Sequence, residues 1–448
     1  MSSPKLGFRA RTNSPDFAIR AIELSTEWFK PRRYKHFDHP VGESFTERAM
    51  DAEFVANHHF KPLIKYIKTT KRYKPSLNET VVKSRPIMYA SHRDACILSY
   101  YSMVIGRLLD KLYLDWNLNK EIIAYRALGR ANYHFSSEVY KIALHMAPCG
   151  ILAFDVSKFF DTLDHKLLKE RLKRVLGLNK LPEDWFNIFR YITKFHYVDK
   201  DDLKSHDRFA ASMTAPGSGQ IASIKDIKAA GINFHQNPLP HAGIPQGTPI
   251  SATMANLYMI DFDKSMQEFC QSIGGIYRRY SDDILIICPV EYVDIAESKF
   301  SELILLERLA ISADKTEKVI FDTTTSKIYG TRSAQYLGFS FYPGGAGIRA
   351  SSLSRQWRKM RRRVRRTGKI AEERIRAGKA DKIWTKSLRR RFLLPQFRNF
   401  SSYARNSAKE FGDGEKITHQ ILRFERSFRR ILQEMVDRCT KQNDANCD

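Results

Sequence analysis

The sequence lacks the long apolar runs and the paired cysteines that define several large classes of protein. No run approaches the roughly 18–20 apolar residues of a transmembrane helix. The first residues, MSSPKLGFRARTNSPDF, include basic residues but no apolar core of a signal peptide. Six cysteines are present, yet none forms a Cys-x-x-Cys pair, and the histidines show no zinc-finger spacing. We therefore expect a reduced, cytoplasmic protein that makes no membrane contact and holds no structural zinc.

Acidic residues are scarce relative to basic ones. The 448 residues include 75 Lys and Arg against 49 Asp and Glu, a net charge of +26. Residues 351–448 alone carry 27 Lys and Arg against 11 Asp and Glu, which accounts for +16 of that charge. Solvated helix faces are one explanation, but basic residues gathered in one region favour a nucleic acid partner.

Two adjacent acids stand out in the stretch YRRYSDDILIIC, residues 277–288. Asp282 and Asp283 separate two apolar and aromatic runs of strand length, a pattern typical of strand–turn–strand. Two carboxylates aimed from such a turn into a cleft indicate a hard cation such as Mg²⁺. The other Asp–Asp pair, Asp201–Asp202, lies among Lys, Ser and His, and we interpret it as part of a solvated loop.

Helical and strand patterns alternate along the chain. Residues 51–75 show a helical pattern, residues 81–89 a basic strand, and residues 150–154 a buried strand that ends at Asp155. Residues 198–240 are polar and rich in Gly, Ser, Asn and Pro, which predicts an inserted loop or small hairpin. From residue 353 onward the sequence is helical and basic. This order predicts an α+β core with a mostly antiparallel sheet, followed by a separate helical domain.

Five motifs together resemble a known family. FDVSKFFDTLDH, GIPQGTPISATMANLYMIDFD, YSDDILI, ADKT and YLGF are similar to the successive motifs of reverse transcriptases, in that family's order, within about residues 81–342. The closest similarity is to bacterial enzymes of group II introns and retrons. RPIMYASHRDACILSYY and FRNFSSYARNSAKEF further resemble the unknown-group reverse transcriptases of antiphage defence.

The resemblance implies a right-hand polymerase fold with an antiparallel palm sheet and an α-helical thumb. It divides the chain into an N-terminal extension with the start of the fingers (1–75), fingers and palm with an insertion (76–350, insertion 198–240), and a basic thumb (351–448). The implied activity is RNA-directed DNA synthesis from dNTPs with two Mg²⁺ ions, for which Mn²⁺ could substitute. The implied partners are a structured non-coding RNA and the DNA product, in antiviral defence. Self-association stays open, and we expect no nuclease domain.

The same motifs imply roles for individual residues. Asp155 and Asp282 would ligate the metal ions, Asp283 would ligate them or support the ligands, and the Val156 carbonyl would add a ligand. Phe160 would collide with a 2′-hydroxyl and so favour deoxynucleotides. The further implied contacts are Lys83, Arg85, Arg126, Gln246 and Gly247 with the incoming nucleotide, Lys315 as general acid, Tyr336, Leu337 and Gly338 as primer grip, and Arg361, Arg362 and Arg365 along the duplex. Gly243 and Gly247 would let the backbone approach the nucleic acid.

Other interpretations compete with these assignments. Phe159 and Phe160 could be core residues, with Phe159 the stronger case, and Lys83, Arg85 and Arg126 could be ordinary surface charges. At the level of function the alternatives are template-independent or protein-primed DNA synthesis, an RNA-dependent RNA polymerase, and a non-catalytic RNA-binding scaffold. Phe160 argues against the RNA polymerase, and the intact acids argue against the scaffold.

Overall fold

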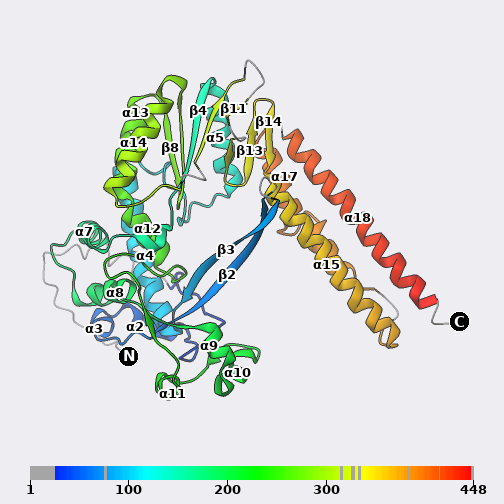
Figure 1. The fold of residues 1–448 in the computed structure, drawn as a ribbon, viewed down its shortest axis with the longest axis horizontal. Helices are drawn as coiled ribbons and strands as arrows, with labels where there is room; N and C mark the ends of the chain where they lie inside the picture. The colour runs from blue at the N-terminus through cyan, green and yellow to red at the C-terminus, as the bar shows by residue number, and fades with distance from the viewer. Residues whose placement is uncertain are drawn as a thin grey trace, which may run out of the picture.

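The computed structural model describes residues 26–74, 78–312, 316–323, 328–330, 334–380, 383–412 and 414–444. It has a mixed α+β fold in which two groups of elements flank an open central gap (Figure 1). Among the described helices, none is both long enough and apolar enough to cross a membrane.

A five-stranded sheet forms the centre of the larger part. Its strand order is β11 (Ile328–Gly330), β10 (Glu317–Phe321), β4 (Cys149–Asp155), β9 (Asp283–Pro289) and β8 (Ile276–Tyr280), and every neighbouring pair is antiparallel. Both faces are buried, because Ile284 and Ile286 enter one apolar core while Leu285 and Ile287 enter the other. Burial on two faces explains why β9 reads as a continuous apolar run. The predicted strand–turn–strand and the buried strand before Asp155 are confirmed.

Helices cover the two faces of this sheet. On one side, α13 (Ile260–Ser272) and α14 (Val293–Leu306) pack against its strands, and α5 (Asn132–Met146) packs on the other (Figure 1). The first core extends through helices that share buried apolar residues: α2 (Thr46–Met50), α3 (Ala52–Ala56), α4 (His92–Asp115), α7 (His165–Leu176), α8 (Glu183–Thr193) and α12 (Ser251–Tyr258).

A long hairpin projects from the lower part of the molecule. It consists of β2 (Leu63–Lys74) and β3 (Glu79–Tyr89), and β5 (His196–Asp199) and β7 (His235–Gln236) extend the same sheet. The helical prediction for residues 51–75 is therefore wrong beyond Ala56. Pro62 cannot continue a helix. Eleven residues of the stretch that follows pair with β3, the next strand along the chain, and a helical pattern does not reveal this pairing.

Residues 198–240 fold into short helices instead of the predicted loop. They comprise α9 (Lys200–Ser205), α10 (Asp207–Thr214) and α11 (Ile224–Ala229), and β6 (Gly219–Gln220) pairs in parallel with β1 (Lys35–His36). A small core that includes Leu203, Phe209 and Ile227, together with Phe37 and Ile64 from outside the segment, holds them together. The polar composition concealed these few apolar residues, because a small unit needs only a few buried side chains.

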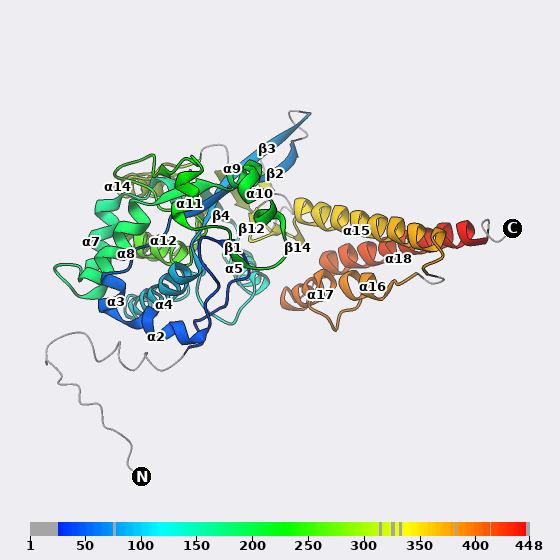
Figure 2. The same ribbon diagram turned by 90° about the horizontal axis from the view of Figure 1, so that it is seen from below.

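The C-terminal region is helical, as the sequence predicts. The three-stranded sheet of β12 (Gln335–Tyr336), β13 (Phe339–Tyr342) and β14 (Gly345–Ile348) leads into α15 (Ala350–Arg376), α16 (Lys386–Phe392), α17 (Phe400–Glu410) and α18 (Glu415–Asp444). Met360, Val364 and Gly368 form the buried stripe by which α15 packs along α18. Both long helices extend away from the sheet (Figures 1 and 2).

Candidate active site

Three acidic residues lie at one end of the five-stranded sheet. Asp155 is the last residue of β4 and stands directly opposite Asp283, the first residue of β9. Asp282 lies in the turn that joins β8 to β9, and its carbonyl oxygen accepts a hydrogen bond from the Val156 nitrogen at 3.3 Å. The antiparallel register thus brings together acids that are more than 120 positions apart in the chain.

A buried ion pair supports the turn that carries Asp282. Arg279 donates to both carboxylate oxygens of Asp263 at 2.6 Å, and both side chains are fully buried. A further nitrogen of the same guanidinium donates to the Ser281 carbonyl at 3.3 Å. Ser281 itself has a φ of +63°, and its hydroxyl lies 2.8 Å from that of Tyr125. The turn is therefore held in a left-handed conformation by groups on both sides.

The surroundings of Asp283 disfavour the ionised form of its carboxyl group. Its side chain reaches solvent, yet burial of the carboxyl among neighbouring protein atoms and the charge of Asp282 raise its pKa to about 6. Arg349, Arg85 and Lys83 act in the opposite direction. A carboxylate whose ionised form is disfavoured in this way gains from a nearby cation. Asp155, Asp282 and Asp283 offer only hard oxygen donors, the ligand type that Mg²⁺ prefers. Among the described residues, however, their ligand atoms do not form a group that lies within 4.8 Å of one another.

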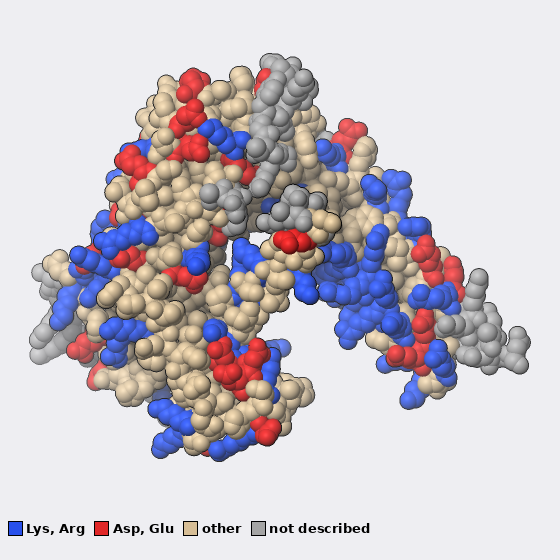
Figure 3. Space-filling model, viewed as in Figure 1, with Lys and Arg blue, Asp and Glu red and all other residues tan. Residues whose placement is uncertain are grey.

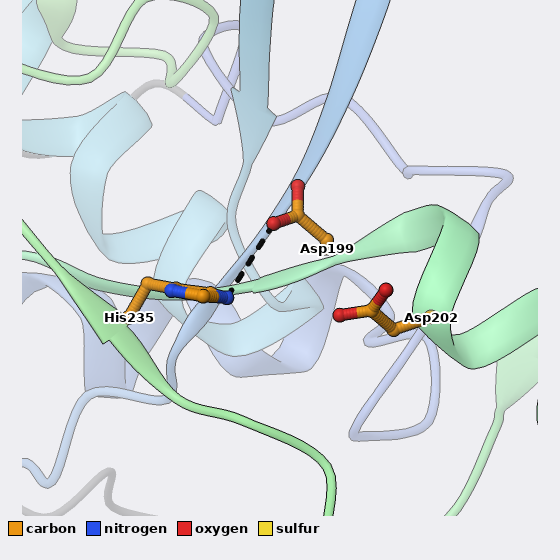
Figure 4. A group of neighbouring side chains, drawn as sticks. All are labelled: Asp199, Asp202 and His235. Carbon is orange, nitrogen blue, oxygen red and sulfur yellow. Dashed lines mark ion pairs between the residues drawn. The ribbon is translucent and has the colours of Figure 1, made fainter.

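A second group of acids contrasts with this one. Asp199, Asp202 and His235 come close enough together to hold a metal ion (Figure 4). However, the Lys65 ammonium lies 3.0 Å from one Asp199 oxygen, and His235 Nε2 lies 3.5 Å from the other. Because the Lys65 ammonium already compensates Asp199, we interpret this group as a polar cluster that joins β5 to β2 and β7.

The segment after Asp155 lies against the loop that contains Gln246. Phe160 belongs to α6 (Phe159–Thr162), is half-buried, and its carbonyl accepts from the Ile244 nitrogen at 2.8 Å. Phe159 is 4% exposed and belongs to the core, which confirms the packing interpretation for that residue. The Gln246 carbonyl accepts from the Met88 nitrogen of β3 at 2.8 Å. These contacts bring Phe160 and Gln246 into one neighbourhood.

The two glycines of this loop have a role within the protein. A Cβ at Gly243 would lie 2.7 Å from the Asp161 carbonyl oxygen, and one at Gly247 would lie 2.6 Å from that of Met88. Both residues also have positive φ angles. The sequence predicted that these glycines let the backbone approach the nucleic acid. In the structure they allow close contact with the protein's own backbone, at Asp161 and Met88.

The predicted cationic residues have different surroundings. Lys83 and Arg85 are exposed on β3, where both lie close enough to lower the pKa of Asp283. Arg126 instead donates to Asp110 at 2.6 Å and to the carbonyls of Asn119 and Ile122 at 3.0 and 2.8 Å. Its part in nucleotide binding stays a prediction. Lys315 lies outside the described residues.

A cavity of about 1080 Å³ connects the acids to the C-terminal helices. Leu337 and Gly338 line it, whereas Tyr336 is 5% exposed and belongs to the core. Basic side chains that share this cavity with Asp283 are Arg349, Arg355, Lys359, Arg390, Arg391 and Arg398. Figure 3 shows Lys and Arg gathered over α15 beside the gap. None of the six was predicted from the sequence motifs. Arg349 lies only ten positions after the YLGF motif, and this closeness was the one sequence feature that could have indicated its place near the acids.

The three arginines that were predicted from the sequence lie on different sides of α15. Arg361 packs beside Trp357, with its Cζ atom 5.6 Å from the ring centroid, in a separate hollow. Residues three or four positions apart lie on the same side of a helix. Arg362 therefore lies on the side of Arg355 and Lys359, which line the cavity, whereas Arg365 lies on the side of Arg361.

Comparisons with known proteins place more than half of the chain in one family. Residues 98–341 match the family model described as reverse transcriptase (RNA-dependent DNA polymerase). A structure of telomerase from Candida albicans, in complex with a fragment of telomeric RNA, is 12% identical with a TM-score of 0.39, covering 86% of this chain and 67% of the telomerase chain. An apo telomerase from Candida tropicalis is 11% identical with a TM-score of 0.40, covering 86% and 59% respectively. A search of curated proteins found no match.

Proposed function

Because the chain belongs to the reverse transcriptase (RNA-dependent DNA polymerase) family, we propose that it extends a DNA primer on an RNA template, with its three-acid cluster as the catalytic centre. The single observation that supports this most strongly is the β4–β9 register, which sets Asp155 opposite Asp283. Asp282 joins them through the backbone contact with Val156. A non-catalytic scaffold would gain nothing from three carboxylates that repel one another.

The acids would hold the cations that the reaction requires. In the proposed centre Asp155 and Asp282 would ligate two Mg²⁺ ions, and Asp283 and the Val156 carbonyl would complete or support the set. When bound, such a pair of ions lowers the pKa of the primer 3′-hydroxyl and stabilises the leaving pyrophosphate. Arg279 and Asp263 keep the turn in position, so the carboxylates need little rearrangement.

The incoming nucleotide is held from the opposite side of the gap. Lys83 and Arg85 bind its triphosphate, which needs cationic partners because it carries several negative charges. Gln246 contacts the base pair and Phe160 lies under the sugar. The assignment of Lys83 and Arg85 is based on their charges, which lie close enough to Asp283 to lower its pKa.

The primer–template duplex lies against the large cavity beside Asp283. Phosphate groups of the duplex contact Arg349, Arg355 and Lys359, and the Leu337–Gly338 turn supports the primer end. The cavity lining and the charge gathered along α15 are the basis for this path. By analogy with the defence-associated enzymes that residues 85–101 and 397–411 resemble, we propose a structured non-coding RNA as template and a role in antiviral defence.

Primer extension tests the proposed activity. The purified protein is incubated with a DNA primer annealed to an RNA template, all four dNTPs and Mg²⁺. We expect template-dependent DNA products, which disappear when EDTA is added and return with Mg²⁺ or Mn²⁺. Absence of products on RNA templates, with products on no template at all, would support template-independent synthesis instead.

Charge reversal on α15 should distinguish the two sides of the helix. Arg355→Glu with Lys359→Glu removes cations from the cavity, so affinity for the primer–template should fall about tenfold near physiological salt. The slope of log affinity against log salt should decrease by about one for each phosphate group that the variant no longer neutralises. Fluorescence anisotropy with a labelled primer–template measures both quantities.

The matched control lies on the same helix. Arg361→Glu with Arg365→Glu introduces the same change in charge, but on the side away from the cavity. We expect at most a small, salt-screened loss of affinity from this pair. Equal losses from the two pairs would contradict the proposed duplex path.

A further inference from the structure

A segment without regular secondary structure runs beside the turn that joins β8 to β9. Residues 119–126, which we call the brace segment, lie between α4 and α5 and make one isolated bridge, between Ile122 and Arg279 of β8. On either side of this bridge, the Arg279 nitrogen donates to the Glu121 carbonyl at 2.8 Å, and the Ile123 nitrogen donates to the Arg279 carbonyl at 3.0 Å. The brace segment is therefore attached to the edge of the five-stranded sheet, next to the proposed catalytic centre.

Side chains add further contacts between the brace segment and the β8–β9 turn. The amide nitrogen of Asn256, which belongs to α12 and is buried, donates to the Ala124 carbonyl at 2.9 Å. The amide oxygen of the same side chain accepts from the Arg279 guanidinium at 3.0 Å. At the surface, the Tyr125 hydroxyl lies 2.8 Å from the Ser281 hydroxyl. The brace segment thus contacts the turn both through the core and from the solvent side.

Arg126 anchors the end of the brace segment. Its side chain is only 6% exposed, and its Cζ atom lies 4.9 Å from the centroid of the Tyr113 ring. Nε donates to Asp110 at 2.6 Å, and one terminal nitrogen donates to the carbonyls of Asn119 and Ile122 at 3.0 and 2.8 Å. The other terminal nitrogen donates to the Asn119 side chain at 2.6 Å. All three nitrogens are engaged within the protein, so a triphosphate could contact this guanidinium only by displacing them.

The two residues whose hydroxyls meet both have an unusual backbone conformation. Tyr125 has a φ of +65° and Ser281 a φ of +63°. Residues other than glycine keep such a conformation only where their surroundings hold them in it. Ser281 directly precedes Asp282, so a change in the turn would move the carboxylate of Asp282. A displacement of about 1 Å at a reacting centre can lower the rate about 100-fold.

From these contacts we propose that Arg126 and Tyr125 are positioning residues of the polymerase centre. Arg126 fixes the brace segment, and Tyr125 holds the β8–β9 turn through Ser281. Together they keep the carboxylate of Asp282 in the position that the reaction needs. This role differs from the nucleotide contact that the sequence motifs imply for Arg126. The inference rests on the proposed polymerase activity.

Steady-state primer extension with Arg126→Ala and Arg126→Lys separates the two roles of this residue. We expect kcat to fall about 10- to 100-fold in both variants, while KM for dNTPs changes by less than about twofold. Lysine keeps the charge that a phosphate contact needs, but it lacks the planar guanidinium that makes the four hydrogen bonds. A raised KM in Arg126→Ala that recovers in Arg126→Lys would assign Arg126 to the nucleotide and overturn the proposal, as would unchanged kinetics in both variants.

The hydroxyl pair gives a test that does not depend on the folding of the Arg126 variants. Tyr125→Phe keeps the ring and Ser281→Ala keeps the Cβ atom, and each should lower kcat about three- to tenfold, the range expected for one hydrogen bond. The double variant should lose no more than either single variant. Losses that multiply in the double variant would show that the two hydroxyls act independently and would contradict the proposed contact.

Hydrogen exchange of the protein alone, without nucleic acid or added metal, gives a readout that is separate from activity. Amides of residues 276–289 should exchange faster in Tyr125→Phe and in Arg126→Ala than in the wild type, because the turn opens more often. Unchanged exchange in both variants would overturn the proposal.

Tyr191→Phe is the matched control. It also removes a tyrosine hydroxyl that makes a hydrogen bond, here to the Lys61 carbonyl at 3.1 Å, away from the β8–β9 turn. Neither kcat nor exchange of residues 276–289 should change in this variant. A wild type that extends a primer, with kcat unchanged in every brace-segment variant, would overturn the positioning role and leave the polymerase proposal intact. A wild type without extension would overturn the polymerase proposal, and hydrogen exchange would still show whether the brace segment holds the turn.

Discussion

Replacing Asp282 and Asp283 together with alanine is expected to lower the rate of primer extension at least about 1,000-fold, because the stabilisation that bound divalent ions supply is worth several kcal/mol. The reason lies in the geometry at the end of the sheet. Asp155 alone would face two methyl groups where the register sets its partner acids. Single-turnover extension in Mg²⁺ measures the loss.

The double variant should stay folded. In the folded protein, burial and the Asp282 charge raise the pKa of Asp283 to about 6, so its ionised form is disfavoured. A carboxyl with a raised pKa opposes folding as the pH rises above its unfolded value. In metal-free buffer at neutral pH, the variant should therefore melt no lower than the wild type, and thermal denaturation with EDTA checks this.

The other Asp–Asp pair in the chain provides the control. Asp201→Ala with Asp202→Ala removes the same two charges from α9, where Asp201 pairs only with Lys204 at 3.1 Å among the interactions described. Extension should be nearly unchanged in this variant. A double variant at 282–283 that still incorporates dNTPs in Mg²⁺ would show that the metal centre is assigned to the wrong residues.

The second large effect is expected at Phe160. Phe160→Val should raise the ratio of kcat/KM for ATP to that for dATP by about 10- to 100-fold, since a ring that fills the space of a 2′-hydroxyl is removed. The half-buried position beside the Gln246 loop leaves part of the ring available to a sugar. Steady-state kinetics with each nucleotide measures the ratio.

A purely structural role for Phe160 makes a different prediction. Phe160 also packs against the core, so its truncation could cost roughly 1–3 kcal/mol and lower both activities together. Phe159→Val is the matched comparison, because that ring is buried and should affect stability without changing sugar choice. A reduced melting temperature with an unchanged ratio in Phe160→Val would reopen the RNA polymerase alternative.

Local patterns predicted the elements that carry the acids. The apolar run on each side of Asp282 identifies two strands because its residue types suit strands buried on both faces. The same reasoning failed for residues 51–75, where a helical pattern gave way to β2. There the deciding factor was pairing with β3, the next strand along the chain, which contributes inter-strand hydrogen bonds that a helical pattern does not reveal.

Side chains with distant partners were the hardest to interpret. In the sequence, Arg279 is an unexplained charge within a strand. The structure explains it, because Arg279 forms a buried ion pair with Asp263 in the core. Arg349 reads as one more basic residue before a basic helix. Its backbone contact with Gly338 and its position beside Asp283 depend on how β13, β14 and α15 pack.

The sequence by itself determined the chemistry: three acids in the spacing of a polymerase motif, the loop that contains Gln246, and a basic helical region. These follow from residue type and order, which are local properties. Only the tertiary structure decided which basic residues face the acids and that a polar segment folds around a small core. Both depend on packing between elements distant in the chain. A helix such as α15, with basic residues on more than one side of its buried stripe, does not reveal in its sequence which basic side meets the cavity.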